Sequence, residues 1–240
     1  MGELVLLLLS TIRLRPYVFL FFGCFLGAAT ADLGWRRAGL FTGLAWLTAF
    51  LAEYSSTRTG IPFGLYHYTE ATRGQELYLA NVPFMDSLSF TFLAYGAFCL
   101  ARLVVGKWPG RTRVTFWSGP FMMLIDLVID PLAARGDRWF LGKIFYYPHG
   151  GLYFGVPLSN FVGWAVVGWA GVGSYLMAAG AEALGTRPRW GVALYFMVLT
   201  FSLTMTWWIG EPALLLAGLV LSLALVVTVI LTVRPRLARM

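Results

Sequence analysis

The stretch PALLLAGLVLSLALVVTVILTV, residues 212–233, decides the fold class. It is apolar on every side and carries no charge, and its length matches the roughly 20 apolar residues that a helix needs to cross a bilayer. The stretch AGLFTGLAWLTAFLAEY, residues 38–54, is similarly apolar around its circumference. Strands of a membrane β-barrel would instead alternate between apolar and polar residues. The sequence therefore predicts an all-α, polytopic transmembrane helical bundle.

Composition agrees with this prediction along the whole chain. Of the 240 residues, 59% are hydrophobic and 12% are charged, and the mean hydropathy is +0.73. A water-soluble domain would have too little polar surface at this composition. We expect a single integral membrane domain, 1–240, with about seven spans. The predicted spans are 16–34, 37–54, 84–105, 114–131, 158–181, 190–209 and 212–233.

The N-terminal segment needs a separate interpretation. ELVLLLLS, residues 3–10, is too short to cross a bilayer, so we expect residues 1–15 to form an interfacial or partly inserted lead-in. Residues 13–31 imitate a secretory signal, with two arginines, an apolar core and Ala29-Thr30-Ala31. Because six more spans follow, we expect this first span to remain uncleaved.

Charge predicts how the bundle is oriented. Alternating spans assign the larger share of the 18 Lys and Arg residues to one end, including WPGRTR (108–113) and RPRLAR (234–239). The positive-inside rule makes this end, and the C-terminus, cytoplasmic. The net charge of +7 follows from this topology and calls for no nucleic-acid partner. Five acids fall at the opposite, non-cytoplasmic end: Glu53, Asp86, Asp126, Asp130 and Glu211.

Two long loops, 55–83 and 132–157, join the acids at that end. Each is rich in Gly and Tyr, carries one histidine (His67 or His149), and closes with Val-Pro three residues before Asp86 or Asn160. Proline at a helix start explains each Val-Pro turn alone. Their shared order predicts a degenerate parallel repeat of helix, aromatic loop and helix, over 37–105 and 114–181.

Asp126 and Asp130 are the strongest candidates for a functional site. A carboxylate within a bilayer costs about 2.5 to 3.5 kcal/mol on insertion scales, so its default interpretation is functional. These two lie about one helical turn apart on one face, where both cannot ionise cheaply. The alternative is that Asp130 ends its helix before Pro131 and pairs with Arg135 or Arg138. Glu53 and Asp86 have the same two interpretations, helix-terminal residue or site residue.

The sequence predicts neither a metal site nor a cofactor. Both histidines lie in the loops rather than in spans, and no HxxxH spacing occurs. Cys24 and Cys99 lie on separate spans and suggest packing rather than a disulfide. The sequence contains no P-loop, no dinucleotide-binding glycine motif and no nucleophile elbow. The density of aromatic residues in GLYHY and YYPHGGLYF suits the stabilisation of a cation.

Taken in order, these segments resemble a known family. TGIPFGLYHY (59–68), the Val82-Pro83 turn, the DxxxDP pattern from Asp126, a later Trp, and GxYFGVPLSNFxGW (151–164) are similar to the membrane-bound carotenoid biosynthesis family. Members of this family in bacteria and haloarchaea hydrate carotenoid end groups. The resemblance covers about residues 50 to 170, while the first 35 residues and the last two helices add little beyond hydrophobicity.

The resemblance implies a cofactor-independent carbon–oxygen lyase. Water would add across the terminal C1–C2 double bond of an acyclic carotenoid end group and leave a tertiary alcohol. This chemistry needs a shielded acid to protonate the alkene and a second group to position water. We expect Asp126 or Asp130 to be the acid, and the other or Glu53 to be the base. The residues expected to position substrate or water are Asp86, Asn160, Tyr66, Tyr68, His149 and Trp164.

The resemblance also implies a location and partners. We expect a multi-pass protein of a prokaryotic cell membrane, with a carotenoid substrate in the bilayer, lipid contacts, and other carotenoid biosynthesis enzymes nearby. The competing class is a small proton-coupled transporter or lipid-binding bundle. Helix breaks at Pro120 and Pro131 and an internal repeat are features that suit a transporter. A transferase acting on a lipid alcohol is a third class, but the sequence has no donor-binding motif for it.

Overall fold

The computed structural model describes residues 2–106, 110–180 and 182–237. Within those residues the chain forms eight α-helices, and four two-residue strands and one 3-10 turn lie in the connections. The helices are α1 (Gly2–Leu14), α2 (Pro16–Leu33), α3 (Trp35–Thr59), α4 (Phe84–Val105), α5 (Arg111–Ala133), α6 (Leu158–Ala178), α7 (Arg189–Trp208) and α8 (Pro212–Leu237). The strands are β1 (His67–Tyr68), β2 (Tyr78–Leu79), β3 (Val82–Pro83) and β4 (Phe145–Tyr146), and η1 covers Gly136–Arg138.

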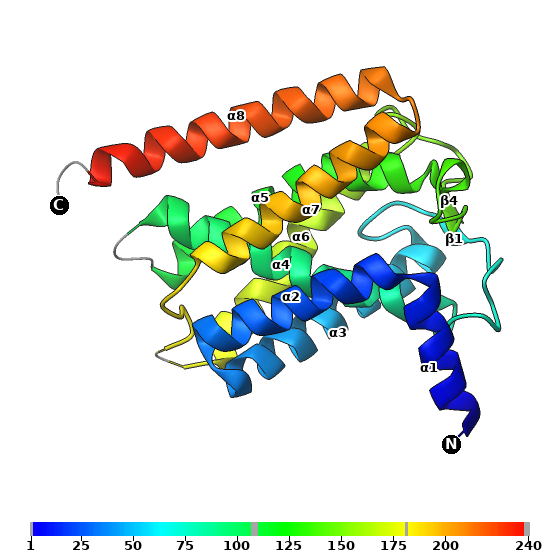
Figure 1. Cartoon of the computed structure of the whole chain (residues 1–240), viewed down its shortest axis with the longest axis horizontal. Coiled ribbons are helices and arrows are strands. Elements are labelled where there is room, and N and C mark those ends of the chain that lie inside the picture. Colours follow the sequence, from blue (N-terminus) through cyan, green and yellow to red (C-terminus); the bar gives the residue numbers. More distant parts are fainter. Residues whose placement is uncertain (1, 107–109, 181, 238–240) are drawn as a thin grey trace.

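The all-α fold class is confirmed. Each of the seven predicted spans coincides with one of the helices α2 to α8, and these helices lie side by side as a bundle (Figure 1). Six of them are long and apolar enough to cross a membrane. The remaining one, α3, has 25 residues and is more polar because it contains Arg36, Arg37, Glu53 and Arg58.

Helix α4 forms the centre of the bundle. Most of its residues are buried, and it packs against α2, α3, α5 and α7. Helix α8 lies at the outer edge (Figure 1) and exposes leucines and valines along its length. In a bilayer these exposed apolar side chains would contact acyl chains, because such contact is as favourable there as burial in protein.

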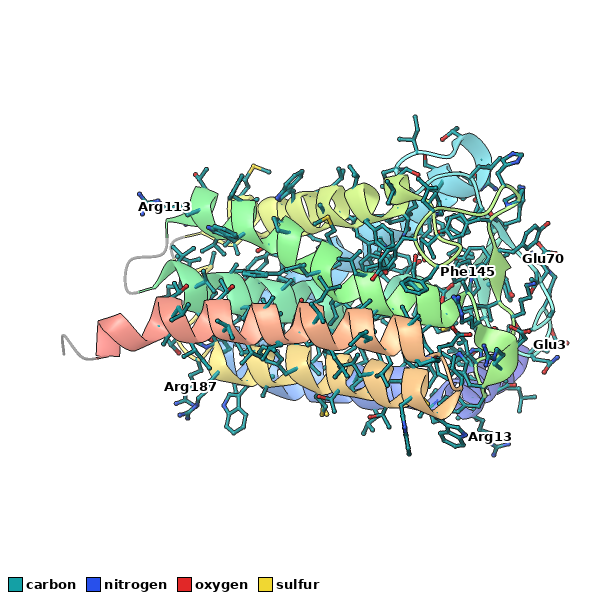
Figure 2. All side chains as sticks on the ribbon, turned by 90° about the horizontal axis from the view of Figure 1, so that it is seen from above. Glu3, Arg13, Glu70, Arg113, Phe145 and Arg187 are labelled. Atoms are coloured by element: carbon teal, nitrogen blue, oxygen red, sulfur yellow. The ribbon has the colours of Figure 1, made fainter. Side chains whose placement is uncertain are left out.

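The chain alternates between the two ends of the bundle as predicted. Figure 2 shows Glu3, Arg13, Glu70 and Phe145 at one end and Arg113 and Arg187 at the other. We call the first the loop end, because it holds both long loops. Residues 107–109 and 238–240, which belong to the charged segments used to predict orientation, lie outside the described residues. The orientation therefore stays a prediction.

Two local predictions have different outcomes. Both Val-Pro turns precede helices, because Pro83 and Pro157 are the residues before α4 and α6. The predicted breaks at Pro120 and Pro131 are wrong, since α5 runs continuously from Arg111 to Ala133. Neighbouring helices cover α5 on several sides, and such packing can hold a helix together across a proline.

Candidate functional site

The two aromatic loops meet over the loop end of the bundle. Strand β1 of the first loop pairs antiparallel with β4 of the second, with His67 opposite Tyr146 and Tyr68 opposite Phe145. Successive strand residues point to opposite faces. Tyr68 and Phe145 are accordingly buried, while Tyr146 is exposed. This pairing joins the halves of the proposed repeat, although the repeat itself remains a prediction.

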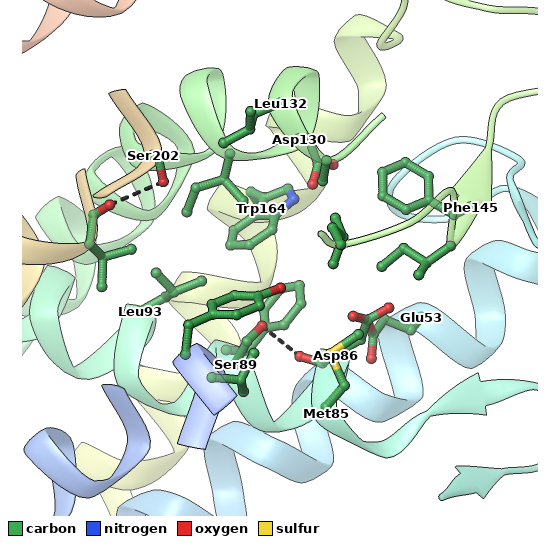
Figure 3. A pocket seen from close by; sticks show the side chains of 18 of the residues that line it. Glu53, Met85, Asp86, Ser89, Leu93, Asp130, Leu132, Phe145, Trp164 and Ser202 are labelled. Carbon is green, nitrogen blue, oxygen red and sulfur yellow. Dashed lines mark hydrogen bonds between the residues drawn. The ribbon is translucent and has the colours of Figure 1, made fainter. Parts of the chain in front are cut away.

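Beneath these loops lies a cavity with a volume of about 140 Å³. An apolar cavity of about 150 Å³ is known to hold benzene, so this one suits a group of about six heavy atoms. Its wall is largely apolar, but three carboxylates face it, from Glu53, Asp86 and Asp130 (Figure 3). Helices α3, α4 and α5 each contribute one of these three acids.

Glu53 is held by two hydroxyl groups on one side of the cavity. The Tyr68 hydroxyl donates to Glu53 Oε1 at 3.0 Å, and the Ser87 hydroxyl donates to Oε2. Tyr68 also lies beside the carboxyl group of Asp86. Ser87 is next to Asp86 in the first turn of α4, so the start of this helix aims both groups at the end of α3. Glu53 thereby has both of its oxygens positioned by hydroxyl groups.

Asp126 and Asp130 form the second acidic group. Their carboxyl groups lie within hydrogen-bonding reach of each other. The Asn160 amide donates to Asp126 Oδ2 at 2.7 Å, and the Tyr147 hydroxyl donates to Asp130 Oδ2 at 3.4 Å. Asp126 is fully buried and its Oδ1 has no hydrogen-bond partner. Asp130 faces the cavity, and Asp126 lies directly behind it.

None of the ion pairs among the described residues includes Glu53, Asp86, Asp126 or Asp130. The alternative in which Asp130 pairs with Arg135 or Arg138 is wrong. Arg135 Nε lies 3.2 Å from Glu211 Oε1, and Arg138 binds the same carboxylate. Glu211, the residue before α8, therefore holds both guanidinium groups in ion pairs. Arg135 also donates to the carbonyl of Pro131 in α5 at 2.9 Å. The cavity acids keep their hydrogen-bonding capacity for a ligand or water.

Three tyrosines in the loops connect the two acidic groups. The hydroxyls of Tyr66 and Tyr68 lie 3.4 Å apart, and the rings of Tyr66 and Tyr147 lie 5.8 Å apart. Burial raises the pKa of all three phenols well above the ordinary value, and the nearby carboxyl groups raise it further. These hydroxyls therefore stay protonated and available as donors.

Most of the predicted site residues meet in the cavity. Seven of them line it: Glu53, Tyr66, Tyr68, Asp86, Asp130, Asn160 and Trp164. Asp126 reaches the cavity only through Asn160 and Asp130. His149 lies in an exposed turn and is not part of the cavity wall. No group of three or more His, Cys, Asp or Glu residues in the described part of the chain is placed to hold a metal ion.

Several residues of the site are absent from the sequence prediction. Ser87 binds Glu53, yet beside a helix start it is indistinguishable from an ordinary first-turn residue. Tyr147 binds Asp130, and its place in YYP, parallel to Tyr68 in YHY, was the available signal. Tyr17 of α2 and Phe201 of α7 line the cavity, and nothing in their apolar surroundings singles them out.

Comparison with known proteins places the chain in a family. The family model described as carotenoid biosynthesis protein matches residues 2–231. A bisanhydrobacterioruberin hydratase from Haloarcula japonica is 32% identical over 233 residues, which cover 89% of this chain and 74% of that protein. No solved structure matches the chain. The protein thus belongs to the carotenoid biosynthesis protein family, as the motifs around its paired acids predict.

Proposed function

We propose that the protein is a carotenoid hydratase that adds water across the terminal C1–C2 double bond of an acyclic end group. The observation that carries this proposal is an apolar cavity, of end-group size, faced by carboxyl groups without ion-pair partners in the described structure. The similarity to a bisanhydrobacterioruberin hydratase supports the same chemistry. The reaction needs one proton donor, one water and one proton acceptor.

Asp130 is the proposed proton donor. It faces the cavity, and Asp126 lies one helical turn behind it. Two carboxyl groups this close do not both ionise at low cost, so in the proposed mechanism the pair shares one proton. Transfer of that proton to C2 forms the new C–H bond with the alkene electron pair and leaves a tertiary cation at C1. The stacked rings of Phe90 and Trp164, 4.3 Å apart, line the same cavity and can stabilise the cation.

Glu53 is the proposed base. Its oxygens accept hydrogen bonds from Tyr68 and Ser87, which hold the carboxyl group in place at the cavity wall. Water held by Glu53 and Asp86 attacks C1, and its proton passes to Glu53. The product is a tertiary alcohol. The reaction is balanced when the proton on Glu53 returns to the Asp126–Asp130 pair, and the hydroxyls of Tyr68 and Tyr147 bind the two ends of that route.

The proposal includes the setting of the enzyme. We infer a multi-pass protein of a prokaryotic cell membrane, with the C-terminus in the cytoplasm and the cavity near the opposite interface. A carotenoid is a stiff rod of about bilayer thickness, so its end group would lie near that interface. Enzymes that make or consume the same carotenoid are the expected neighbours.

The test is expression of the full chain in cells that accumulate lycopene, followed by liquid chromatography and mass spectrometry of the extracted pigments. We expect a product heavier by one water, about 18 Da, because protonation and water capture add nothing else. The matched control is the Asp130→Asn variant at equal membrane abundance. Unchanged pigment with both lycopene and a monocyclic carotenoid would contradict the proposal.

A further inference from the structure

The cavity has two chemically different halves. Glu53, Asp86 and Asp130 lie on the side of Phe145, whereas Leu93 and Ser202 lie on the opposite side (Figure 3). The hydroxyl of Ser202 donates to the carbonyl of Val198 at 3.0 Å, so it offers little to a ligand. We call this second half the apolar arm, which is lined by Val18, Phe21, Phe92, Leu93, Leu132, Val198 and Ser202.

The apolar arm ends at a cluster of rings, which we call the aromatic seam: Tyr17, Trp139, Phe140 and Phe201. Tyr17 of α2 stacks on Phe201 of α7 at 5.4 Å, and Phe140 packs edge-on against Tyr17 at 5.5 Å. Tyr17, Trp139 and Phe201 line the cavity, while Phe140 is 52% exposed. The seam therefore extends from the cavity to the outer surface of the bundle, where α2 and α7 pack together.

The cavity is too small to hold a whole carotenoid. A volume of about 140 Å³ holds about six heavy atoms, so a carotenoid that places its end group among the acids must continue outside the cavity. On the side of the acids, the wall carries three carboxyl groups and the hydroxyls of buried tyrosines. The apolar arm is the side whose chemistry suits a hydrocarbon.

We propose that the aromatic seam binds the conjugated chain next to the reacting end group and passes it into the bilayer between α2 and α7. This inference rests on the proposed function, because it takes the end group to lie at the acids. The faces of aromatic rings bind flat conjugated systems by stacking. The ring pairs of the seam would part or slide to admit the chain.

A second hollow in the bundle does not provide this route. It lies between α4, α5 and α8, has a volume of about 500 Å³, and is lined by residues that include Arg113, Trp117 and Leu225. It shares no lining residue with the acidic cavity. Arg113 lies at the end of the bundle opposite the loops (Figure 2), far from the acids that would bind the end group.

The test is protection of a cysteine in the seam. Phe201→Cys is made in a Cys24→Ser background, since Cys24 is exposed and Cys99 is buried, with Asp130→Asn added to stop turnover. The control is Leu216→Cys on α8, where the native side chain is 64% exposed. Both proteins, in liposomes, are labelled with a lipid-soluble maleimide with and without lycopene. We expect lycopene to slow labelling of Cys at 201 by about fivefold or more, as for a mostly occupied site, and to leave position 216 unchanged.

Equal labelling of position 201 with and without lycopene would overturn the inference. Phe140→Cys reports on the outer rim in the same way if Phe201→Cys fails to accumulate. Pigment analysis of the parent protein separates the two proposals. Hydrated product without protection at either seam position would place the chain elsewhere and leave the hydratase intact. Protection without any hydrated product would support the seam and contradict the hydratase.

Discussion

Two buried acidic sites lie at opposite ends of the bundle, and their partners differ. At the end opposite the loops, Asp32 accepts hydrogen bonds from Arg102 at 2.5 and 3.2 Å, from Tyr95 at 3.1 Å, and from the backbone N–H groups of Thr186 and Arg187. At the loop end, Asp130 has a 3.4 Å hydrogen bond from Tyr147, a carboxyl neighbour and no ion pair among the described contacts.

The difference separates an acid that joins helices from the acids that we propose to act on the substrate. Asp32 ties α2 to α4 and to the segment before α7, and a buried charge satisfied in this way is stable in place. The acids that line the cavity, Glu53, Asp86 and Asp130, have no ion pair among the described residues. A proton-coupled transporter would need titratable groups along its path, and Asp32, the buried acid at the far end, is occupied by Arg102. The comparison therefore favours chemistry at one end over transport between both.

The largest expected effect is a loss of hydration rate when Asp130, at the loop end, is changed. Asp130→Asn removes the proposed proton donor but keeps its shape, and should lower the hydration rate by about 10³-fold, since general acid catalysis contributes about 10² to 10⁴. Asp126→Asn should lower it less, because Asp126 does not face the cavity. The measurement is the initial rate of product formation per unit of protein in membranes. Full activity in both variants would exclude the pair as acid and base.

The second-largest expected effect is a loss of stability when Asp32, at the end opposite the loops, is changed. Asp32→Asn leaves Arg102 buried without its counter-ion and should lower the free energy of unfolding by about 3 kcal/mol. The measurement is the fraction that stays monodisperse in detergent after heating, with Asp130→Asn as the matched control. We expect Asp130→Asn to be no less stable than the parent, because Asn keeps the shape of the side chain and its oxygen can still accept the hydrogen bond from Tyr147. Equal loss of stability in both variants would show that the ion pair of Asp32 does not distinguish it from Asp130 in its contribution to stability.

The sequence contains enough information to predict one of these sites. Alternation of apolar spans is sufficient to bring Glu53, Asp86, Asp126 and Asp130 to one end, because each span reverses the chain direction. The same reasoning leaves Asp32 as a lone polar residue on a long helix. Its partners come from α4 and from the segment before α7, and distant partners of this kind follow from packing rather than from local pattern.

The sequence also does not predict which apolar residues line the cavity. Tyr17 and Phe21 belong to the first 35 residues, and Phe201 to the seventh of the eight helices, where the sequence shows only hydrophobicity. In a bilayer an apolar residue can face lipid or protein at similar cost. Apolar pattern consequently does not determine which face of α2 or α7 lines the cavity. The partner of Arg135 and Arg138 could not be predicted from local sequence either, because Glu211 comes from the end of another helix.

Removal of the proposed base should have an intermediate effect. Glu53→Gln keeps the size of the side chain but cannot take a proton from water, so the hydration rate should fall by about 10²-fold. Ser87→Ala removes one of the two hydroxyls that hold Glu53 and should cost less than about tenfold, consistent with one hydrogen bond. Initial rates in matched membranes measure both. A larger loss in Ser87→Ala than in Glu53→Gln would assign the main role to the hydroxyl.

The smallest expected effect concerns a third kind of acid, the surface residue Glu211. It lies 3.2 Å from Arg135 Nε, also binds Arg138, and is partly exposed with its arginines. Glu211→Gln should therefore lower stability by less than about 1 kcal/mol, as for exposed ion pairs, and leave the hydration rate unchanged. The measurements are the heating assay and the initial rate. The variant also frees both arginines close to the end of α5. If either moved to Asp130, the rate would fall toward that of Asp130→Asn, and the absence of an ion pair at Asp130 would be shown to depend on Glu211.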